Sequence, residues 1–403
     1  MFEEPPAAPE AMPGALRDAV ACCSDGAVVG YGDAAERYRV GAPAPLPGRG
    51  RSDEKLLTRF GLQITSPFTR EAGSASARRS ASPSAQGAWA VGFEWVASAA
   101  AAAEQAGFDS IWVPDNPWRT EAGDRCFECY TLLGALAVVT SRARIGAMVS
   151  GVGYRNPAYV VKQVSTLDVL SGGRAVLGIG AGCLPEQPSL PDGHLGAPAG
   201  THSLEVGERR LGRLGDALAI FRAMLDEDNP SYEGAHYRIA GAMNKPGAVS
   251  PEGIPILVGG GGERIIRLAA QHADACNFVG SPAAMRQKVA LVRRSCEQIG
   301  RDPSSITCTR LGVLAIADTS SEARHLADAY AAARGLDEEA AAALVTWGDP
   351  AMVVDKAGAL LEAGLDGLVF STGAMPDVET IALAGHTLTR AFGISGSSRG
   401  TSS

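Results

Sequence analysis

Apolar residues recur along this chain at two spacings, one typical of helices and the other of buried strands. Between residues 157 and 171 they return every three or four positions, which predicts a helix that begins after Asn156 and ends in a left-handed turn at Gly172 and Gly173. Residues 174–180 then form a short, mainly apolar run without alternation, as expected for a parallel strand buried on both faces. The apolar face of the helix comprises Val160, Val161, Val164, Leu167 and Leu170.

The same succession of helix and strand extends over most of the chain. Strands are expected at 60–64, 108–113, 144–150, 174–180, 254–258, 273–279, 306–316 and 366–370. Further helices are expected at 89–106, 128–140, 208–226, 263–272, 282–299, within 321–363 and at 378–392, with a short hairpin at 231–239. Because every strand is followed by a helix, the strands should be parallel, and the pattern favours an α/β fold, a (β/α)8 TIM barrel with insertions.

Several segments lack any sustained period. Residues 1–58 are rich in Ala, Pro and Gly, so we expect a disordered extension there, the barrel over 59–393, and a disordered tail over 394–403. Residues 73–87, rich in Ser and Ala, predict a loop, and 183–207 predict a long irregular insertion.

Charge and composition exclude several classes of protein. The 403-residue chain has a net charge of -8 and no basic stripe, which argues against a nucleic-acid partner. No apolar run approaches about 18 residues and no secretory signal opens the chain, so we expect a cytoplasmic protein with reduced cysteines and no membrane span. Cys126 and Cys129 form a single C-x-x-C pair, which does not complete a zinc site. Neither does the spacing of Cys183, Asp192, His194 and His202, so no metal is expected.

Glycines cluster where two of the predicted strands end. The strand at 174–180 contains Gly178 and Gly180 near its end, and Gly182 follows it. Glycine within a strand indicates close approach of a ligand or of another backbone. Four glycines at 259–262 precede the helix at 263–272, where free N–H groups and the helix dipole would favour an anion. Arg264 and Arg267 add positive charge nearby; the alternative is a loop that only lets helix pack on strand.

Six motifs occur in order on the expected elements, at 61–64, 107–113, 154–157, 166–174, 177–182 and 256–263. Together they resemble the luciferase-like monooxygenase family, most closely its branch of coenzyme F420-dependent oxidoreductases, over about residues 60–392. The resemblance implies that F420, a deazaflavin, lies at the barrel mouth and exchanges a hydride at its C5 with a small organic substrate. The cofactor-binding residues that it implies include Gly180, Gly182, Gly259, Gly260, Gly261, Gly262 and Arg264.

The resemblance also implies features at the ends of the second and third strands. A bulge in the strand at 144–150 would carry a cis peptide bond between Ala147 and Met148 behind the deazaflavin ring, with an ordinary strand as the alternative. Asp115 would hold the cofactor or cap its turn. Asn116 stands where the family commonly has His; it keeps the hydrogen bonding but cannot exchange a proton near pH 7.

Two glutamates are then candidates for the acid or base. Glu128 matches a family Glu, although it could equally stabilise the start of its helix. Glu186 could replace a second family Glu one position away, between two prolines that alter the loop. Trp118 and Tyr154 could line the pocket or serve packing alone.

Two other functions remain open. One is an FMN-dependent monooxygenase fed by a separate reductase. The other is a non-catalytic barrel that binds cofactor or partner, which the residues at Asn116 and Cys183 motivate. A homodimer is compatible with either, and no residue identifies the substrate.

Overall fold

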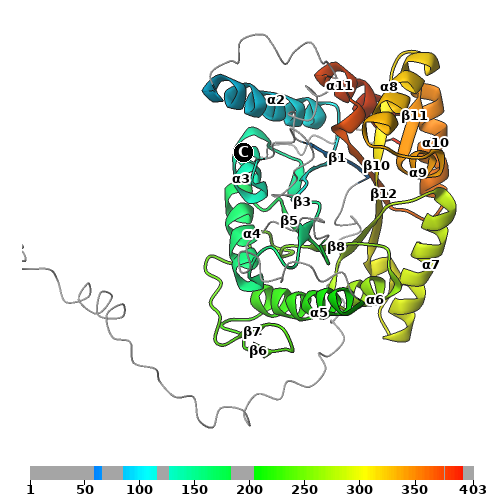
Figure 1. Ribbon diagram of the computed structural model, residues 1–403. Coiled ribbons are helices and arrows are strands. Elements are labelled where there is room, and N and C mark those ends of the chain that lie inside the picture. Colours follow the sequence, from blue (N-terminus) through cyan, green and yellow to red (C-terminus); the bar gives the residue numbers. More distant parts are fainter. Residues whose placement is uncertain (1–58, 66–84, 116–126, 183–203, 376, 394–403) are drawn as a thin grey trace, which may run out of the picture. The chain divides into compact units, whose positions relative to one another are not determined.

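The computed structural model describes residues 59–65, 85–115, 127–182, 204–375 and 377–393. The predictions for the extension at 1–58, the tail at 394–403 and most of the insertion at 183–207 lie outside these residues. Apart from one two-stranded hairpin, the strands among these residues form a single sheet that closes on itself, with helices around the outside (Figure 1).

The barrel contains parallel strands in the order β1, β2, β3, β5, β8, β9, β10, β12, after which β12 pairs with β1 again. Their order in the sheet is their order along the chain, which confirms the (β/α)8 prediction. The strands are β1 (Phe60–Gln63), β2 (Ser110–Val113), β3 (Arg144–Ala147), β5 (Ala175–Gly180), β8 (Ile256–Gly259), β9 (Ala275–Phe278), β10 (Thr307–Ile316) and β12 (Gly367–Ser371).

A helical crossover follows each strand. The helices are α2 (Ala85–Gln105), α3 (Cys129–Val139), α4 (Pro157–Ser171), α5 (Leu204–Asp226), α6 (Glu263–His272), α7 (Pro282–Gln298), α8 (Ser320–Ala333), α9 (Glu338–Leu344), α10 (Pro350–Glu362) and α11 (Val378–Ala391). The predicted ends of α4 are confirmed, because Asn156 accepts a hydrogen bond from the Ala158 N–H and Gly172 has φ 68°. The predicted hairpin consists of β6 (Tyr232–Glu233) and β7 (Arg238–Ile239).

Two helix starts and one strand differ from the prediction. Helix α2 begins at Ala85 and helix α5 at Leu204, each four residues before its expected start, so the last residues of the predicted loop at 73–87 and of the predicted insertion at 183–207 are helical. Strand β11 (Val345–Gly348) lies where only helices were expected. It pairs with Val313–Ile316 of β10. The last three of these residues extend past the pairing of β10 with β12, so β11 supplies partners for backbone groups that would otherwise lack them. A four-residue strand in an alanine-rich stretch leaves almost no periodic signal.

The strand expected at 144–150 is interrupted by a bulge. Gly146 pairs with Val176 and Ser150 of β4 (Ser150–Gly151) pairs with Ile179, so three residues on one strand face two on the other. The extra residue is the defining feature of a β-bulge. We call Ala147, Met148 and Val149 the bulge. The cis peptide bond joins Met148 to Val149, so the prediction of Ala147–Met148 was wrong by one residue.

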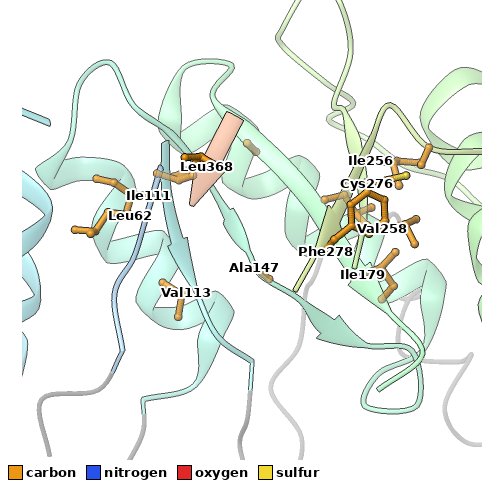
Figure 2. Close-up of a cluster of buried hydrophobic side chains, with 14 of the residues drawn as sticks. Leu62, Ile111, Val113, Ala147, Ile179, Ile256, Val258, Cys276, Phe278 and Leu368 are labelled. Atoms are coloured by element: carbon orange, nitrogen blue, oxygen red, sulfur yellow. The ribbon is translucent and has the colours of Figure 1, made fainter. Parts of the chain in front are cut away.

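Alternation along the strands divides the buried side chains into two layers. Those that face the helices form the larger core; Figure 2 shows part of it, with Ile111 and Val113 from β2 and Val258 from β8. Those that face the barrel axis form a smaller cluster of Trp112, Met148, Val176, Leu257, Ala275 and Val369. The bulge contributes Met148 to this inner cluster, and Val149 packs against it, near the carboxyl ends of the strands.

Candidate functional site

The inward-facing glycines near the carboxyl ends of β5 and β8 are explained by the bulge. An ideal Cβ on Gly178 would lie 1.9 Å from the Ala147 carbonyl oxygen, so no side chain fits there. An ideal Cβ on Gly180 would lie 2.9 Å from one methyl group of Val149, and an ideal Cβ on Gly259 would lie 2.9 Å from both. Of the two reasons that the sequence offered for this cluster, close approach of another strand is the one the structure shows, and Val149 takes the space that the glycines leave.

Two hydrogen bonds fix Met148 within the bulge. The Met148 N–H donates to the Val113 carbonyl oxygen of β2 at 2.9 Å. The Gln63 side chain of β1 donates from Nε2 to the Met148 carbonyl oxygen at 2.8 Å. Gln63 is buried, and sequence analysis did not select it. Its signal was a lone amide in the apolar run 60–64, since a buried polar group requires a partner.

Asp115, two residues past the end of β2, is held by protein partners. Its carboxylate accepts hydrogen bonds from both terminal nitrogens of Arg155, at 2.5 and 3.2 Å, and from the Ser150 hydroxyl at 2.7 Å. Its side chain is 1% exposed. The role that these contacts indicate is to join β2 to the residue after the bulge. The predicted contact with a cofactor remains a prediction.

Glu128 has the geometry of a helix cap. Its carboxylate accepts from the Thr131 N–H at 2.7 Å and from Arg155 at 2.5 Å. Burial alone would raise the pKa of Glu128, but the hydrogen bonds from Thr131 and Arg155 outweigh it and hold the pKa below its usual range. A carboxylate that stays ionised at neutral pH is poorly suited to donate a proton, so the geometry favours the structural interpretation of Glu128.

The glycine loop at 259–262 leaves the start of α6 without a side-chain cap. The N-cap residue is Gly262, which has no side chain to accept a hydrogen bond from the first turn. Gly260 has φ 134°, a conformation that favours glycine. Arg264, predicted to bind the cofactor, forms an exposed ion pair with Glu208 of α5. Arg267 pairs with Glu263 on its own helix.

Lys288 of α7 supplies a different cation at this loop. Its amino group donates to the Val279 carbonyl oxygen at 2.8 Å and lies 2.5 Å from the position of an ideal Cβ on Gly261. Burial lowers the pKa of Lys288, and none of the described carboxylates forms an ion pair with it. Sequence analysis missed Lys288 because it lies in the second turn of a helix that follows another strand.

The remaining candidates are divided by what the structure describes. Tyr154 lies at the mouth, where its ring is 2.7 Å from an ideal Cβ on Gly151 and 3.9 Å from one on Gly182. Asn116, Trp118, Cys126 and Glu186 lie outside the described residues. So do Cys183, Asp192, His194 and His202; among the residues described, no cluster could hold a metal ion. No helix in the described part of the chain is long and apolar enough to cross a membrane.

Comparison with known proteins gives relatives of two kinds. The F420-dependent glucose-6-phosphate dehydrogenase of Intrasporangium calvum is 35% identical over 175 residues, 43% of this chain and 49% of that protein. The chain therefore spans about half the length of this relative. An F420-dependent secondary alcohol dehydrogenase, solved with an F420–acetone adduct, superposes over 83% of this chain and 99% of its own, with a TM-score of 0.65 at 18% identity.

The monooxygenase RslO1 of Streptomyces bottropensis has the same coverage, with a TM-score of 0.65 at 17% identity. At such identities the two solved structures support the fold alone. Residues 72–367 match the family model described as luciferase-like monooxygenase, which is most of the barrel. The chain belongs to the luciferase-like monooxygenase family.

Proposed function

We propose that this protein is an F420-dependent oxidoreductase that transfers a hydride between the deazaflavin and a small organic substrate. The observation that carries the proposal is the arrangement at the barrel mouth, where a bulge and a cationic glycine loop lie at the ends of neighbouring strands β3, β5 and β8. The F420-dependent relative agrees with the choice of cofactor.

The described residues fit a cofactor that has a flat ring and an anionic tail. The glycine loop leaves the α6 N-terminus uncapped, and Lys288 brings a positive charge to Gly261 without a carboxylate to neutralise it among the described residues. We assign the phosphate of the tail to Gly259, Gly260, Gly261 and Gly262, with Lys288 in place of Arg264. We assign the ring to the bulge.

When bound, F420 supplies a carbon, C5, that gives or accepts a hydride. The protein has to orient the ring, keep water from the reacting carbon and move a proton. Arg155 holds both Asp115 and Glu128, so neither has a free carboxylate for proton transfer. Glu186 is therefore our candidate for the acid or base, and Asn116 for a hydrogen bond to the ring.

Titration of the purified protein with F420 and with FMN tests the choice of cofactor. We expect the fluorescence of F420 to be quenched when it binds to the protein. We expect F420 to bind at least about tenfold more tightly than FMN. Tighter binding of FMN, with oxygen consumption once a reductase is added, would replace this proposal by the monooxygenase. Binding of F420 without hydride transfer to any substrate in a broad screen would favour the non-catalytic barrel.

A further inference from the structure

The bulge has little support from β5, the strand on one side of it. Its pairing to β5 stops at Gly146 and resumes at Ser150. β5 and β8 have glycines where they face the bulge, so no side chain from those positions packs against Val149. The position of Val149 therefore depends on hydrogen bonds from elsewhere in the barrel.

Two supports reach the bulge from opposite ends. Gln63 and the Val113 carbonyl hold Met148, as described above. Ser150, directly after Val149, donates its hydroxyl to Asp115 at 2.7 Å and lies 3.1 Å from the Tyr130 hydroxyl. The second support therefore depends on the orientation of the Asp115 carboxylate.

Arg155 sets that orientation. Its guanidinium forms two hydrogen bonds to Asp115 and one to Glu128, and it lies 4.9 Å from the centre of the Tyr130 ring. The side chains of Asp115 and Arg155 are 1% and 15% exposed, so water does little to screen the pair. A bidentate fork fixes both the position and the plane of a carboxylate, which the single ammonium of lysine cannot do.

We propose that Arg155 is a positioning residue for the bulge, acting through Asp115 and Ser150, and thereby for the ring of the bound deazaflavin. Arg155 need not touch the cofactor. It fixes the carboxylate that anchors the far end of the bulge, so that Val149 presents one surface to the mouth. The inference rests on the proposed function, since it takes the bulge as the surface behind the ring.

Three variants separate positioning from simple stabilisation. Arg155→Lys keeps the charge and loses the fork. Arg155→Met loses both and leaves Asp115 as a buried carboxylate without a counter-ion. Arg155→Met combined with Asp115→Asn removes that uncompensated charge, so it should recover much of the lost stability while leaving Ser150 without its oriented acceptor. Lys245→Met with Asp228→Asn is the matched control, because it breaks an exposed ion pair.

The stability of each protein is measured by urea unfolding. In a separate experiment each folded protein is titrated with F420, and the absorption spectrum of the bound cofactor is recorded. We expect Arg155→Met and the double variant to bind F420 about tenfold or more weakly, with a spectrum displaced towards that of the free cofactor, and Arg155→Lys to fall between them and the parent. The double variant should regain stability without regaining affinity. The control should match the parent.

Two results would overturn the inference while leaving the proposed function in place. One is parental affinity and spectrum in all three Arg155 variants. The other is affinity that returns with stability in the double variant, which would make Arg155 a structural residue only. If Arg155→Met does not fold, Arg155→Lys and the double variant provide the same comparison. If the parent itself does not bind F420, the proposed function fails and the inference is withdrawn with it.

Discussion

Replacing Gly178 by alanine should disturb the bulge more than any other single added methyl group in the barrel wall. The new Cβ would lie 1.9 Å from the Ala147 carbonyl oxygen, whereas real Cβ contacts almost never fall below 3.0 Å. The two backbones must then separate by roughly 1 Å, because a carbonyl cannot rotate away as a side chain can. Overpacking of this kind typically costs about 1–3 kcal/mol, and an obstructing backbone places Gly178→Ala at about 3 kcal/mol of unfolding free energy.

Equilibrium unfolding in urea, followed by far-ultraviolet circular dichroism, measures this cost. Gly134→Ala in α3 is the matched control, because an ideal Cβ on Gly134 meets no atom within 4 Å. Alanine is also the better helix former, so the control should gain roughly 0.5–1 kcal/mol. Gly178→Ala should in addition weaken F420 binding, because Ala147 belongs to the bulge. A Gly178→Ala protein as stable as the parent, with unchanged affinity, would refute the explanation of the glycine cluster.

Three further predictions concern other residues. Gly259→Ala should destabilise the protein, because its Cβ would lie 2.9 Å from both methyl groups of Val149. Adding Val149→Ala should restore stability in the double variant. Equal urea midpoints for the two single variants and the double variant would contradict this. Burial, with Arg222 and Arg301 nearby, lowers the pKa of His272 to about 4, below its unfolded value. The neutral His272 side chain should therefore contribute about 3 kcal/mol to the free energy of unfolding above pH 6.5, and this contribution should be lost as the pH falls towards 4. His272→Gln should flatten that decline in urea unfolding between pH 7 and pH 4, while substitution of an exposed histidine should not. Glu186→Gln should remove one limb of the pH profile of hydride transfer while leaving F420 affinity near the parental value, and an unchanged profile would eliminate Glu186 as the acid or base.

The barrel was predictable because its evidence is local and repeated. Each strand and helix carries its own periodicity, and eight such units in order leave few topologies. β11 was missed because its existence depends on a tertiary fact, the length by which β10 passes its neighbours, and not on its own four residues. The bulge was expected only because of the resemblance to the family, and its cis bond lies one residue beyond the expected position.

The candidate site was harder to predict because its contacts join residues far apart in the sequence. The glycines at 178, 180 and 259 gave a clear signal of close approach, but only the structure shows that the approaching group is the bulge. Arg155 contacts carboxylates 27 and 40 positions away, and Gln63 reaches a carbonyl 85 positions away. Nothing in the spacing of these residues predicts such pairs. Arg264 looked suitable in the sequence, yet Glu208 pairs with it in the structure.

One comparison of affinities tests whether the glycine loop binds the phosphate of the cofactor. The parent, Gly261→Val and Lys288→Met are each titrated with F420 and with the deazaflavin–ribityl fragment of F420, which has the ring but no phosphate. A valine at 261 would bring its Cβ to 2.5 Å from the Lys288 amino group and displace it, and methionine at 288 removes the charge. We predict that both variants bind F420 about tenfold or more weakly than the parent and bind the fragment as the parent does. Equal losses for F420 and the fragment, or no loss for either, would show that the phosphate does not bind at the glycine loop.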